Sequence, residues 1–322
     1  MSNQWVFMRV AVLIPCYNEE KAIPSVVRDF RAALPDAEIY VYDNNSRDRT
    51  VEMACEAGAF VRSEPLQGKG NVVRRMFADV DADVYVMVDG DGTYDAASAP
   101  RMIERLLTGH LDMVVGSRLQ TEASGAFRAG HHFGNKLLTG TVSYIFGDRF
   151  DDMLSGYRIF SRRFVKSFPA VSAGFETETE LAVHALSLRL PVAEIETPYG
   201  ARPEGSVSKL NTYRDGVRIS WMILQLFREE KPMAFFSLLF LFLAAVSIAV
   251  GLPVVIEFME TGLVPRLPTA LLAASIMLLA FLSLVSGFIL DNVTRGRREI
   301  KRLAIWRCLR WRIPRRGGDE RA

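Results

Sequence analysis

Two long stretches without a charged residue limit what this chain can fold into. They run from Met233 to Ile256 and from Leu267 to Leu290, and each holds 24 residues. As a helix at about 1.5 Å per residue, each would be about 36 Å long, enough to cross a hydrocarbon layer of about 30 Å. Buried core helices are the alternative, but a globular helix rarely stays uncharged on every face. The sequence therefore predicts two transmembrane helices.

The charges around these stretches predict their orientation. The connector from Glu257 to Arg266 holds two acidic residues and one arginine, whereas residues 295–322 hold eleven Lys or Arg and three acidic residues. The positive-inside rule places this basic tail in the cytoplasm. Two spans return the chain to its starting side, so we expect both termini and the N-terminal domain to be cytoplasmic. The expected location is the cytoplasmic (inner) membrane, as a multi-pass protein.

Charge and cysteine usage indicate partners and compartment. The tail carries net +8 and the whole chain net +2, so residues 1–294 carry net −6. We expect the tail to lie on anionic headgroups of the lipid bilayer. No nucleic-acid partner is expected, and a homo-oligomer is left open. Cys16, Cys55 and Cys308 are far apart and odd in number, which indicates reduced thiols rather than disulfides or a zinc site.

Strand and helix patterns alternate over residues 1–210. Short apolar runs predict strands at Arg9 to Pro15, Glu38 to Tyr42, Ala59 to Arg62, Val84 to Val88 and Met113 to Val115. Amphipathic stretches between them predict helices at Ile23 to Ala33, Thr50 to Ala57, Asn71 to Val80 and Ala99 to Leu107. This alternation predicts an α/β domain with a mostly parallel sheet covered by helices on both faces. No G-x-G-x-x-G or Walker motif is present.

The segment VYVMVDGDGTYD, residues Val84 to Asp95, places Asp89 and Asp91 at the end of a buried strand. Ligands of open α/β sheets bind beyond the carboxyl ends of the strands. Two close carboxylates repel each other, and a divalent cation relieves that cost. Mg²⁺ suits one or two carboxylates together with substrate phosphates. A solvated Asp-Gly turn is the alternative interpretation.

The two preceding strands also end in polar residues. Residues 15–19 read PCYNE after the first strand, and residues 43–48 read DNNSRD after the second. Ser46 or Asp48 could cap the helix that begins near Thr50, but Asp43 precedes the cap position. Three adjacent strands with such ends predict a pocket for a base, a ribose and a metal-bound diphosphate.

Seven motifs follow one another in a specific order. They are VLIPCYNEE, VYDNNSRDRT, QGKGN, VDGDGTYD, VGSRL, DMLSGYRIF and ARPEGSVSKL. The ordered set resembles the family 2 glycosyltransferases with the GT-A fold, over about residues 8–215. It is most similar to the polyprenyl-phosphate glycosyltransferases, the group of dolichol-phosphate mannosyltransferase and its bacterial undecaprenyl-phosphate relatives. Two motifs depart from their commoner forms: DNNS stands in place of DDGS, and GDGTYD stands in place of DADLQ. These departures affect what can be inferred about the sugar, but they do not change the inferred reaction class.

The resemblance, together with the uncharged runs and the charge pattern, implies a domain organisation. Residues 1–210 would form a cytoplasmic, Rossmann-like GT-A catalytic domain, and residues 211–231 a juxtamembrane amphipathic segment. Residues 232–294 would form a two-helix transmembrane hairpin, and residues 295–322 the basic cytoplasmic tail. The stretch from Tyr213 to Arg228 mixes apolar residues with arginines. It suits a helix in the membrane interface or, equally, a helix packed on the catalytic domain.

The resemblance also implies roles for residues on the donor side. The nucleotide pocket would be lined by Pro15, Tyr17, Glu19, Asp43, Lys69 and Asp89. Asp91, with Asp89, would hold Mg²⁺ or Mn²⁺ against the leaving diphosphate, and Arg118 would face the phosphates. Asp152 matches a position sometimes proposed as the base, and we expect it to orient the phosphate or sugar.

Acceptor and sugar contacts are implied in the same way. A polyprenyl phosphate needs cations near the membrane, and the expected residues are Arg128, Asn135, Arg202 and Lys209. Glu178 and Glu180 would contact sugar hydroxyls, or would simply favour the start of a helix through its dipole.

The expected activity is inverting transfer of a sugar from a nucleotide-sugar, with UDP favoured, to a polyprenyl phosphate such as undecaprenyl phosphate. The product would serve later glycan or lipid modification. A processive synthase would need more membrane helices and a Q-x-x-R-W motif, and Arg310-Trp311 lacks the glutamine. Two competing functions stay open. One is a membrane-tethered nucleotide-sugar binder without transfer activity, and the second is a transferase that uses another lipid or glycan acceptor.

Overall fold

The computed structural model describes residues 8–118, 140, 152–170, 176–200, 221 and 224–307. Contacts within the chain divide it into two units. The first comprises Met1–Ile219 with Lys301–Ala322, and the second comprises Ser220–Ile300.

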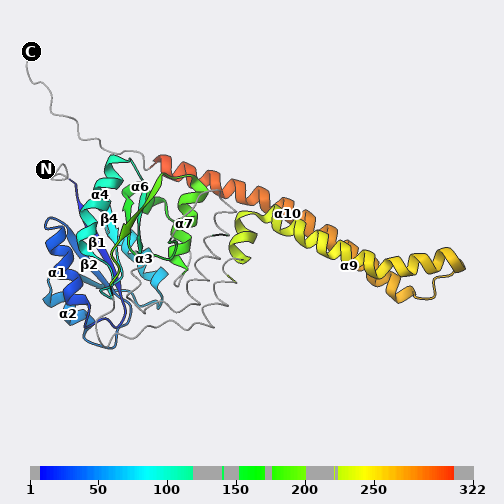
Figure 1. The fold of residues 1–322 in the computed structure, drawn as a ribbon, viewed down its shortest axis with the longest axis horizontal. Helices are drawn as coiled ribbons and strands as arrows, with labels where there is room; N and C mark the ends of the chain where they lie inside the picture. The colour runs from blue at the N-terminus through cyan, green and yellow to red at the C-terminus, as the bar shows by residue number, and fades with distance from the viewer. Residues whose placement is uncertain are drawn as a thin grey trace, which may run out of the picture. The chain divides into compact units, whose positions relative to one another are not determined.

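Among the described residues of the first unit, seven strands form one sheet in the order β3-β2-β1-β4-β6-β5-β7 (Figure 1). The strands are β1 (Val10–Cys16), β2 (Glu38–Asp43), β3 (Phe60–Ser63), β4 (Val84–Met87), β5 (Met113–Arg118), β6 (Arg158–Ser161) and β7 (Val192–Thr197). β6 runs antiparallel to β4 and β5, and the remaining pairs are parallel. The mostly parallel sheet confirms the α/β prediction, although the sequence pattern does not mark the reversed strand.

Helices cover both faces of the sheet. They are α1 (Ile23–Ala33), α2 (Thr50–Glu56), α3 (Lys69–Asp79), the 3₁₀ turn η1 (Ala96–Ser98), α4 (Ala99–Thr108), α6 (Arg162–Ser167) and α7 (Thr177–Leu188). α1 contacts α2, η1 and α4, whereas α3 contacts α6 and α7. Figure 1 shows these two groups on opposite sides of the sheet. The four helices predicted from the sequence nearly coincide with α1, α2, α3 and α4.

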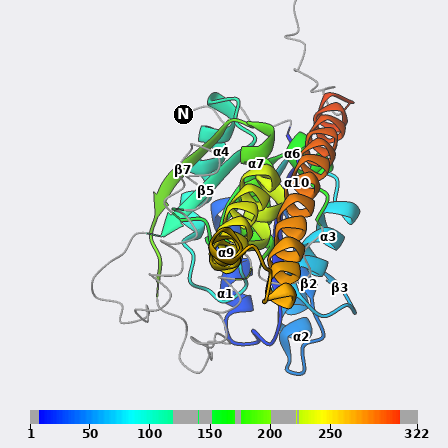
Figure 2. The same cartoon turned by 90° about the vertical axis from the view of Figure 1, so that its right-hand side faces the viewer.

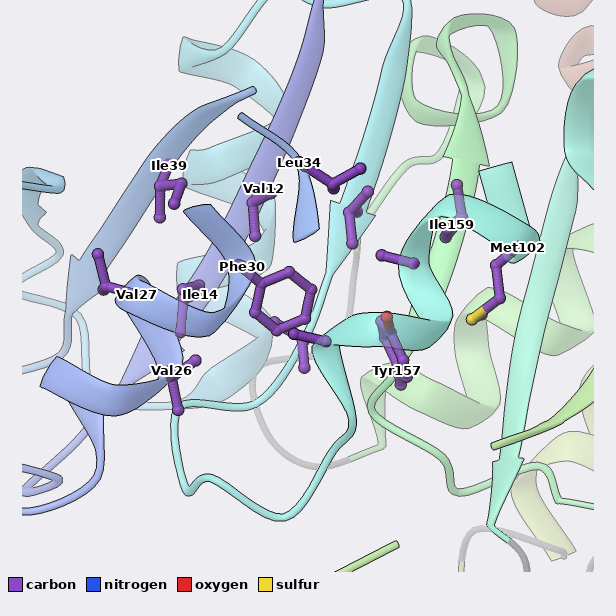
Figure 3. Packing of buried hydrophobic residues seen from close by; sticks show 14 of the residues in the cluster. Val12, Ile14, Val26, Val27, Phe30, Leu34, Ile39, Met102, Tyr157 and Ile159 are labelled. Carbon is purple, nitrogen blue, oxygen red and sulfur yellow. The ribbon is translucent and has the colours of Figure 1, made fainter. Parts of the chain in front are cut away.

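α1 packs on the sheet through one apolar side. Its buried residues Ile23, Val26, Val27 and Phe30 recur at the three- and four-residue spacing of a single helix face. Phe30 meets the ring of Tyr157 edge-on, with centroids 6.0 Å apart (Figure 3). Because Tyr157 directly precedes β6, this contact joins α1 to the segment that leads into the reversed strand.

The strand order reverses beside β1. The chain continues from β1 to β2 on one side, whereas β4 pairs with β1 on the other side. In α/β sheets the loops diverge at such a reversal, and ligands bind there, outside the carboxyl ends of the strands. The polar segments after β1, β2 and β4 follow these carboxyl ends.

The second unit contains a pair of long helices. α9 (Pro232–Thr261) and α10 (Leu267–Arg307) lie side by side (Figures 1 and 2), and the last residues of α10 belong to the first unit. Ser247 Oγ of α9 donates to the carbonyl of Ala273 in α10 (2.7 Å), and a Cβ on Gly251 would lie 3.2 Å from Ala273 Cβ. Small residues thus let the helices approach closely. By length and composition alone, both helices could cross a membrane.

Candidate functional site

Hydrogen bonds join the loops after β1 and β2. The N–H of Asn18 donates to Ser46 Oγ (2.9 Å), and the N–H of Arg47 donates to Asn18 Oδ1 (2.7 Å). Asn18 and Asn45 have φ angles of 53° and 63°, a left-handed conformation that asparagine tolerates better than most residues. The asparagines of the CYNEE and DNNS motifs therefore fix the shape of both loops.

Asn44 connects the β2 loop to the segment before α3. Its amide donates to the carbonyls of Glu64 (2.9 Å) and Leu66 (2.8 Å), and its Oδ1 accepts from the N–H of Gly68 (2.7 Å). Gly68 has a φ of 129°, which favours glycine, directly before Lys69 begins α3. The sequence pattern assigns no role to this buried amide, yet it sets where Lys69 enters the site.

Two acidic side chains, one at the end of β2 and one in the loop that follows, bind backbone N–H groups. Both carboxylate oxygens of Asp43 accept from Ser46, at 3.3 and 3.2 Å. Asp48 accepts from the N–H groups of Glu20 (3.1 Å) and Thr50 (3.0 Å). Burial alone would raise the pKa of Asp48, but hydrogen bonds from Thr50 and Glu20 hold that pKa below its ordinary value. Asp48 therefore satisfies the start of α2, while a nucleotide contact of Asp43 stays a prediction.

Lys69 lies between two carboxylates from distant parts of the chain. Its Nζ forms ion pairs with Asp89, just after β4, and with Glu178, in the first turn of α7. The side chains of Lys69 and Glu178 are 9% and 5% exposed. Burial alone would lower the pKa of Lys69, but the two carboxylates raise it above its ordinary value. The lysine is therefore charged and compensates one of two clustered negative charges.

Glycines allow close packing around this cluster. A Cβ at Gly156 would lie 2.2 Å from Asp89 Oδ2, so the absence of a side chain lets the carboxylate pack against the backbone. A Cβ at Gly90 would lie 2.5 Å from Cys16 Sγ. The end of β1 and the turn after β4 thus approach each other because residue 90 is glycine.

Asp91 is oriented by its neighbour Thr93. Its Oδ1 accepts from the N–H (3.2 Å) and the hydroxyl (2.6 Å) of Thr93, and the residue is 7% exposed. Within the described ranges, no group of three or more His, Cys, Asp or Glu could hold a metal ion. Two carboxylates alone do not complete the coordination of a divalent ion, which takes further oxygen ligands. Asp89 and Asp91 offer oxygens of the kind that Mg²⁺ and Mn²⁺ bind, and their role as metal ligands stays a prediction.

Arg118, the last residue of β5, forms a two-pronged ion pair with Asp152. Its Nε donates to Oδ2 (2.6 Å) and its Nη2 to Oδ1 (2.7 Å), and its guanidinium lies 5.5 Å from the ring centroid of Tyr199. Burial alone would lower the pKa of Arg118, but Asp152 raises it above its ordinary value. The carboxylate of Asp152 is therefore fixed in position by a permanent cation.

The turn that carries Asp152 and Gly156 is built around a buried arginine. Arg158 is 0% exposed and donates through Nε to the carbonyl of Ser155 (3.0 Å) and through Nη2 to that of Met153. Burial lowers the pKa of Arg158. Because a buried cation is costly without hydrogen bonds, Arg158 and the turn carbonyls hold each other in place.

The structure brings together some predicted residues and leaves others undescribed. The structure brings Lys69 into contact with Asp89 and Glu178. Glu180 is half-buried and lies two residues after Glu178, a spacing at which two side chains point in different directions on a helix. The half-buried residues Pro15, Tyr17 and Glu19 lie at or just beyond the carboxyl end of β1. The proposed acceptor residues lie outside the described residues; they are Arg128, Asn135, Arg202 and Lys209.

Comparison with known proteins identifies the family. The profile of Glycosyl transferase family 2 matches residues 11–168. Glycosyltransferase AglJ of Haloferax volcanii is 37% identical over 232 residues, which are 71% of this chain and 75% of that protein. The chain belongs to glycosyl transferase family 2. The resemblance inferred from the seven motifs is thereby confirmed.

Two further proteins are similar to this family 2 glycosyltransferase, and they align with it over different numbers of residues. Protein RfbJ of Shigella flexneri is 61% identical over 122 residues, which are 38% of this chain and 95% of that protein. The dolichyl-phosphate hexose transferase of Haloferax volcanii is 29% identical over 231 residues, 71% of this chain and 98% of that protein.

Solved structures share a fold with this chain over 69% of its length. Glucosyl-3-phosphoglycerate synthase from Mycobacterium tuberculosis, in complex with phosphoglyceric acid, gives a TM-score of 0.58 at 24% identity, covering 69% of this chain and 80% of that one. The same enzyme with Mn²⁺, UDP-glucose and phosphoglyceric acid gives 0.57 at 23% identity, with the same coverage. The GT-A fold expected from the sequence is confirmed.

Proposed function

We propose that this family 2 glycosyltransferase transfers a sugar, with inversion, from a nucleotide-sugar to a polyprenyl phosphate. UDP is the favoured donor nucleotide and undecaprenyl phosphate the favoured acceptor, and the product would serve later glycan or lipid modification. The observation that carries the proposal is the cluster of Asp89, Asp91 and Lys69 after β4 and at the start of α3, beside the reversal in strand order.

The donor site is proposed from the chemistry of this cluster. Asp91 and Asp89 would hold Mg²⁺ or Mn²⁺, which when bound supplies charge compensation for the leaving diphosphate. The Lys69 ammonium is a suitable partner for a diphosphate oxygen. The crystal structure of glucosyl-3-phosphoglycerate synthase with Mn²⁺ and UDP-glucose is compatible with this assignment, although those ligands belong to that enzyme.

The proposed chemistry requires little help from a base. A phosphate oxygen of the acceptor is already anionic near neutral pH, so a strong base is not needed. We assign Asp152 to orienting the acceptor or sugar, because Arg118 engages both of its oxygens. One oxygen of Glu178 pairs with Lys69, and the other is suited to accept a hydrogen bond from a sugar hydroxyl.

The acceptor and the membrane belong to the same proposal. α9 and α10 would cross the cytoplasmic membrane with the catalytic domain and both termini inside, which would keep the site near a lipid-borne phosphate. A relative named dolichyl-phosphate hexose transferase supports a polyprenyl phosphate as acceptor. The cations proposed for its headgroup are Arg128, Arg202 and Lys209, with Asn135 as a neutral partner.

The test is a donor screen on the full chain in detergent micelles. UDP- and GDP-sugars would be offered with Mn²⁺ and undecaprenyl phosphate, and nucleotide release and lipid-linked sugar would both be measured. We expect release from one donor to depend on the lipid phosphate and to disappear in Asp91→Asn. Release that is independent of the lipid, or a nucleotide-sugar that binds without any transfer, would contradict the proposal.

A further inference from the structure

The second unit has a hollow at one end of its helix pair. Its volume is about 520 Å³. It is lined by Glu230, Lys231, Met233, Ala234, Ser237, Asp291, Thr294, Arg295 and Arg298. The uncharged run of α9 begins at Met233, and Asp291 is the first charged residue after the uncharged run of α10. The hollow therefore lies at the boundary between the apolar and the charged parts of both helices.

Hydrogen bonds between the two sides fix this hollow. Thr294 Oγ1 of α10 donates to the carbonyl of Glu229 (3.2 Å). Arg298 Nη2 donates to the carbonyl (2.9 Å) and to Oε2 (2.8 Å) of Glu230. The segment before α9 is thus tied to α10, and the lining residues are positioned by contacts within the unit.

The lining carries an excess of positive charge. Asp291 pairs with Arg295 (2.8 Å), and Glu230 pairs with Arg298 (2.8 Å). Lys231 is exposed and forms no ion pair within the part of the chain that the structure describes. The lining therefore holds three cations and two carboxylates. The positive charge of Lys231 is the one that these two ion pairs do not balance, so it can interact with an anionic ligand.

The start of α9 adds to this positive field. α9 has 30 residues, begins with Pro232, and has neither a side-chain cap nor an acidic residue in its first turn. Residues 224–230 directly before it are helical as well, and Thr294 and Arg298 bind the carbonyls of Glu229 and Glu230 at the end of that helix. The first-turn N–H groups of α9 are therefore the part of this backbone that favours an anion. Met233 and Ala234 of this first turn line the hollow. The start of the helix and the basic side chains would therefore attract an anion into the same hollow.

We propose that the hollow binds the phosphate of an anionic membrane lipid. Lys231, Arg295 and the start of α9 would contact the phosphate, and the hydroxyl of Thr294 would serve an ester oxygen. Met233 and Ala234 would adjoin the apolar part of the lipid. The inference rests on the part of the proposed function in which α9 and α10 cross a membrane, since that puts the hollow at headgroup level.

The experiment measures lipid binding without any donor. The full chain in detergent would be titrated with phosphatidylglycerol, phosphatidylcholine, undecaprenyl phosphate or inorganic phosphate, and complexes counted by native mass spectrometry. The test variant is Lys231→Gln with Arg295→Gln. The control variant is Arg228→Gln with Arg297→Gln, which removes two exposed charges of the same unit outside the lining.

We expect the test variant to bind phosphatidylglycerol at least about tenfold more weakly than the control variant, because two cations that attract the lipid phosphate are removed from the lining. Phosphatidylcholine should bind more weakly than phosphatidylglycerol to the wild type. The titration with undecaprenyl phosphate shows whether the acceptor binds in the same hollow. If its binding also weakens in the test variant, that would again support a site for a lipid phosphate.

Three results would overturn the inference. They are equal binding by the test and control variants, equal binding of both phospholipids, or inorganic phosphate binding as tightly as phosphatidylglycerol. If the double variant misfolds, Lys231→Gln alone replaces it, because this exposed side chain forms no ion pair in the described residues. Asp91→Asn protein should retain the lipid, so a failure of sugar transfer and a failure of lipid binding are told apart.

Discussion

Lys69 Nζ contacts Oε1 of Glu178, while Oε2 of the same carboxylate is buried and has no hydrogen-bond partner among the described residues. The lysine also pairs with Asp89. One ammonium therefore pairs with two carboxylates and offsets one of their two negative charges. Asp89, one of the pair, is a proposed metal ligand. A divalent ion that arrives with the donor would meet a cluster whose negative charge the lysine already offsets in part.

Lys69→Met is expected to increase the affinity for Mn²⁺ in the absence of nucleotide. Without the ammonium, two clustered carboxylates lack their counter-charge, and a cation relieves that cost. We expect a dissociation constant lower by about tenfold, equivalent to about 1.4 kcal/mol, measured by calorimetry or by the electron paramagnetic resonance of free Mn²⁺. The same variant should bind UDP more weakly, because the diphosphate loses a cation.

Two further variants make this prediction specific. Lys69→Met combined with Glu178→Gln should return the Mn²⁺ affinity toward the wild-type value, because one carboxylate charge is gone. Lys21→Met removes an exposed lysine and should leave the affinity unchanged. Equal or weaker Mn²⁺ binding by Lys69→Met would show that the lysine does not oppose the ion.

Asp91→Asn should abolish metal-dependent transfer while the protein stays folded. The asparagine can still accept from Thr93, as Asp91 does, but it lacks the charge that a divalent ion requires. We expect transfer to fall by about a hundredfold or more, the magnitude for removal of one electrostatic group from an active site. The measurement is initial rate against Mn²⁺ concentration, together with thermal unfolding.

Asp95→Asn is the matched control for this substitution. Asp95 accepts from Ser98 Oγ (2.7 Å) at the start of η1, so the change removes a carboxylate four residues away. A small loss of stability with near-normal transfer is expected. If Asp91→Asn keeps most of its activity at saturating Mn²⁺, the metal assignment is wrong.

Arg118→Gln and Asp152→Asn should each destabilise the protein, and the double variant should lose less than the sum. Each single change leaves a mostly buried charge without its partner, which costs about 3 kcal/mol. A double-mutant cycle on chemical unfolding measures the coupling, expected at about 1.5 to 3 kcal/mol. Additive losses would mean that the pair contributes nothing as a pair.

Transfer rates of the same variants separate positioning from catalysis. If Asp152 removed a proton, Asp152→Asn would eliminate the rate at every pH. If it orients the acceptor, we expect a higher KM for the lipid and a residual kcat. Kinetics with varied undecaprenyl phosphate therefore distinguish the two roles.

Much of the fold could be predicted because local patterns agree with tertiary packing. The apolar runs at Val10–Cys16 and Val84–Met87 are buried on both faces, which is what a continuous run in a parallel sheet indicates. The antiparallel direction of Arg158–Ser161 could not be predicted. It depends on pairing with two strands far away in the sequence, and periodicity carries no information on strand direction.

The sequence could predict where the residues of the candidate site lie along the strands and helices, but not which of their side chains contact one another. Asp89 and Asp91 could be placed at a strand end, because the run before them is a strand. The contact of Lys69 with Glu178 could not, since it requires the packing of α3 against α7. The hydrogen bonds of Asn44 were hidden for a similar reason: the DNNS motif suggests a turn, and the motif does not show what its amides bind.

His184 should make the protein less stable as the pH falls below about 6.5. It lies in α7 between Phe164 and Phe168, with Nε2 3.1 Å from Ser167 Oγ and with Nδ1 unpartnered in the described residues. Burial lowers the pKa of His184 from 6.5 to about 3. Above pH 6.5 the ring is neutral in both the folded and the unfolded state.

Below that pH the unfolded state takes up a proton and the folded state does not, so the free energy of unfolding falls. At pH 5 the loss from this group is about 2 kcal/mol. We expect His184→Gln, which cannot titrate, to lower stability at pH 7.5 and to show a shallower decline toward pH 5. His110→Asn is the matched control, because it changes an exposed histidine with a φ of 48° that asparagine accepts. Urea unfolding between pH 7.5 and 5 measures the difference, and identical slopes for wild type and His184→Gln would show that His184 does not resist protonation in the folded protein.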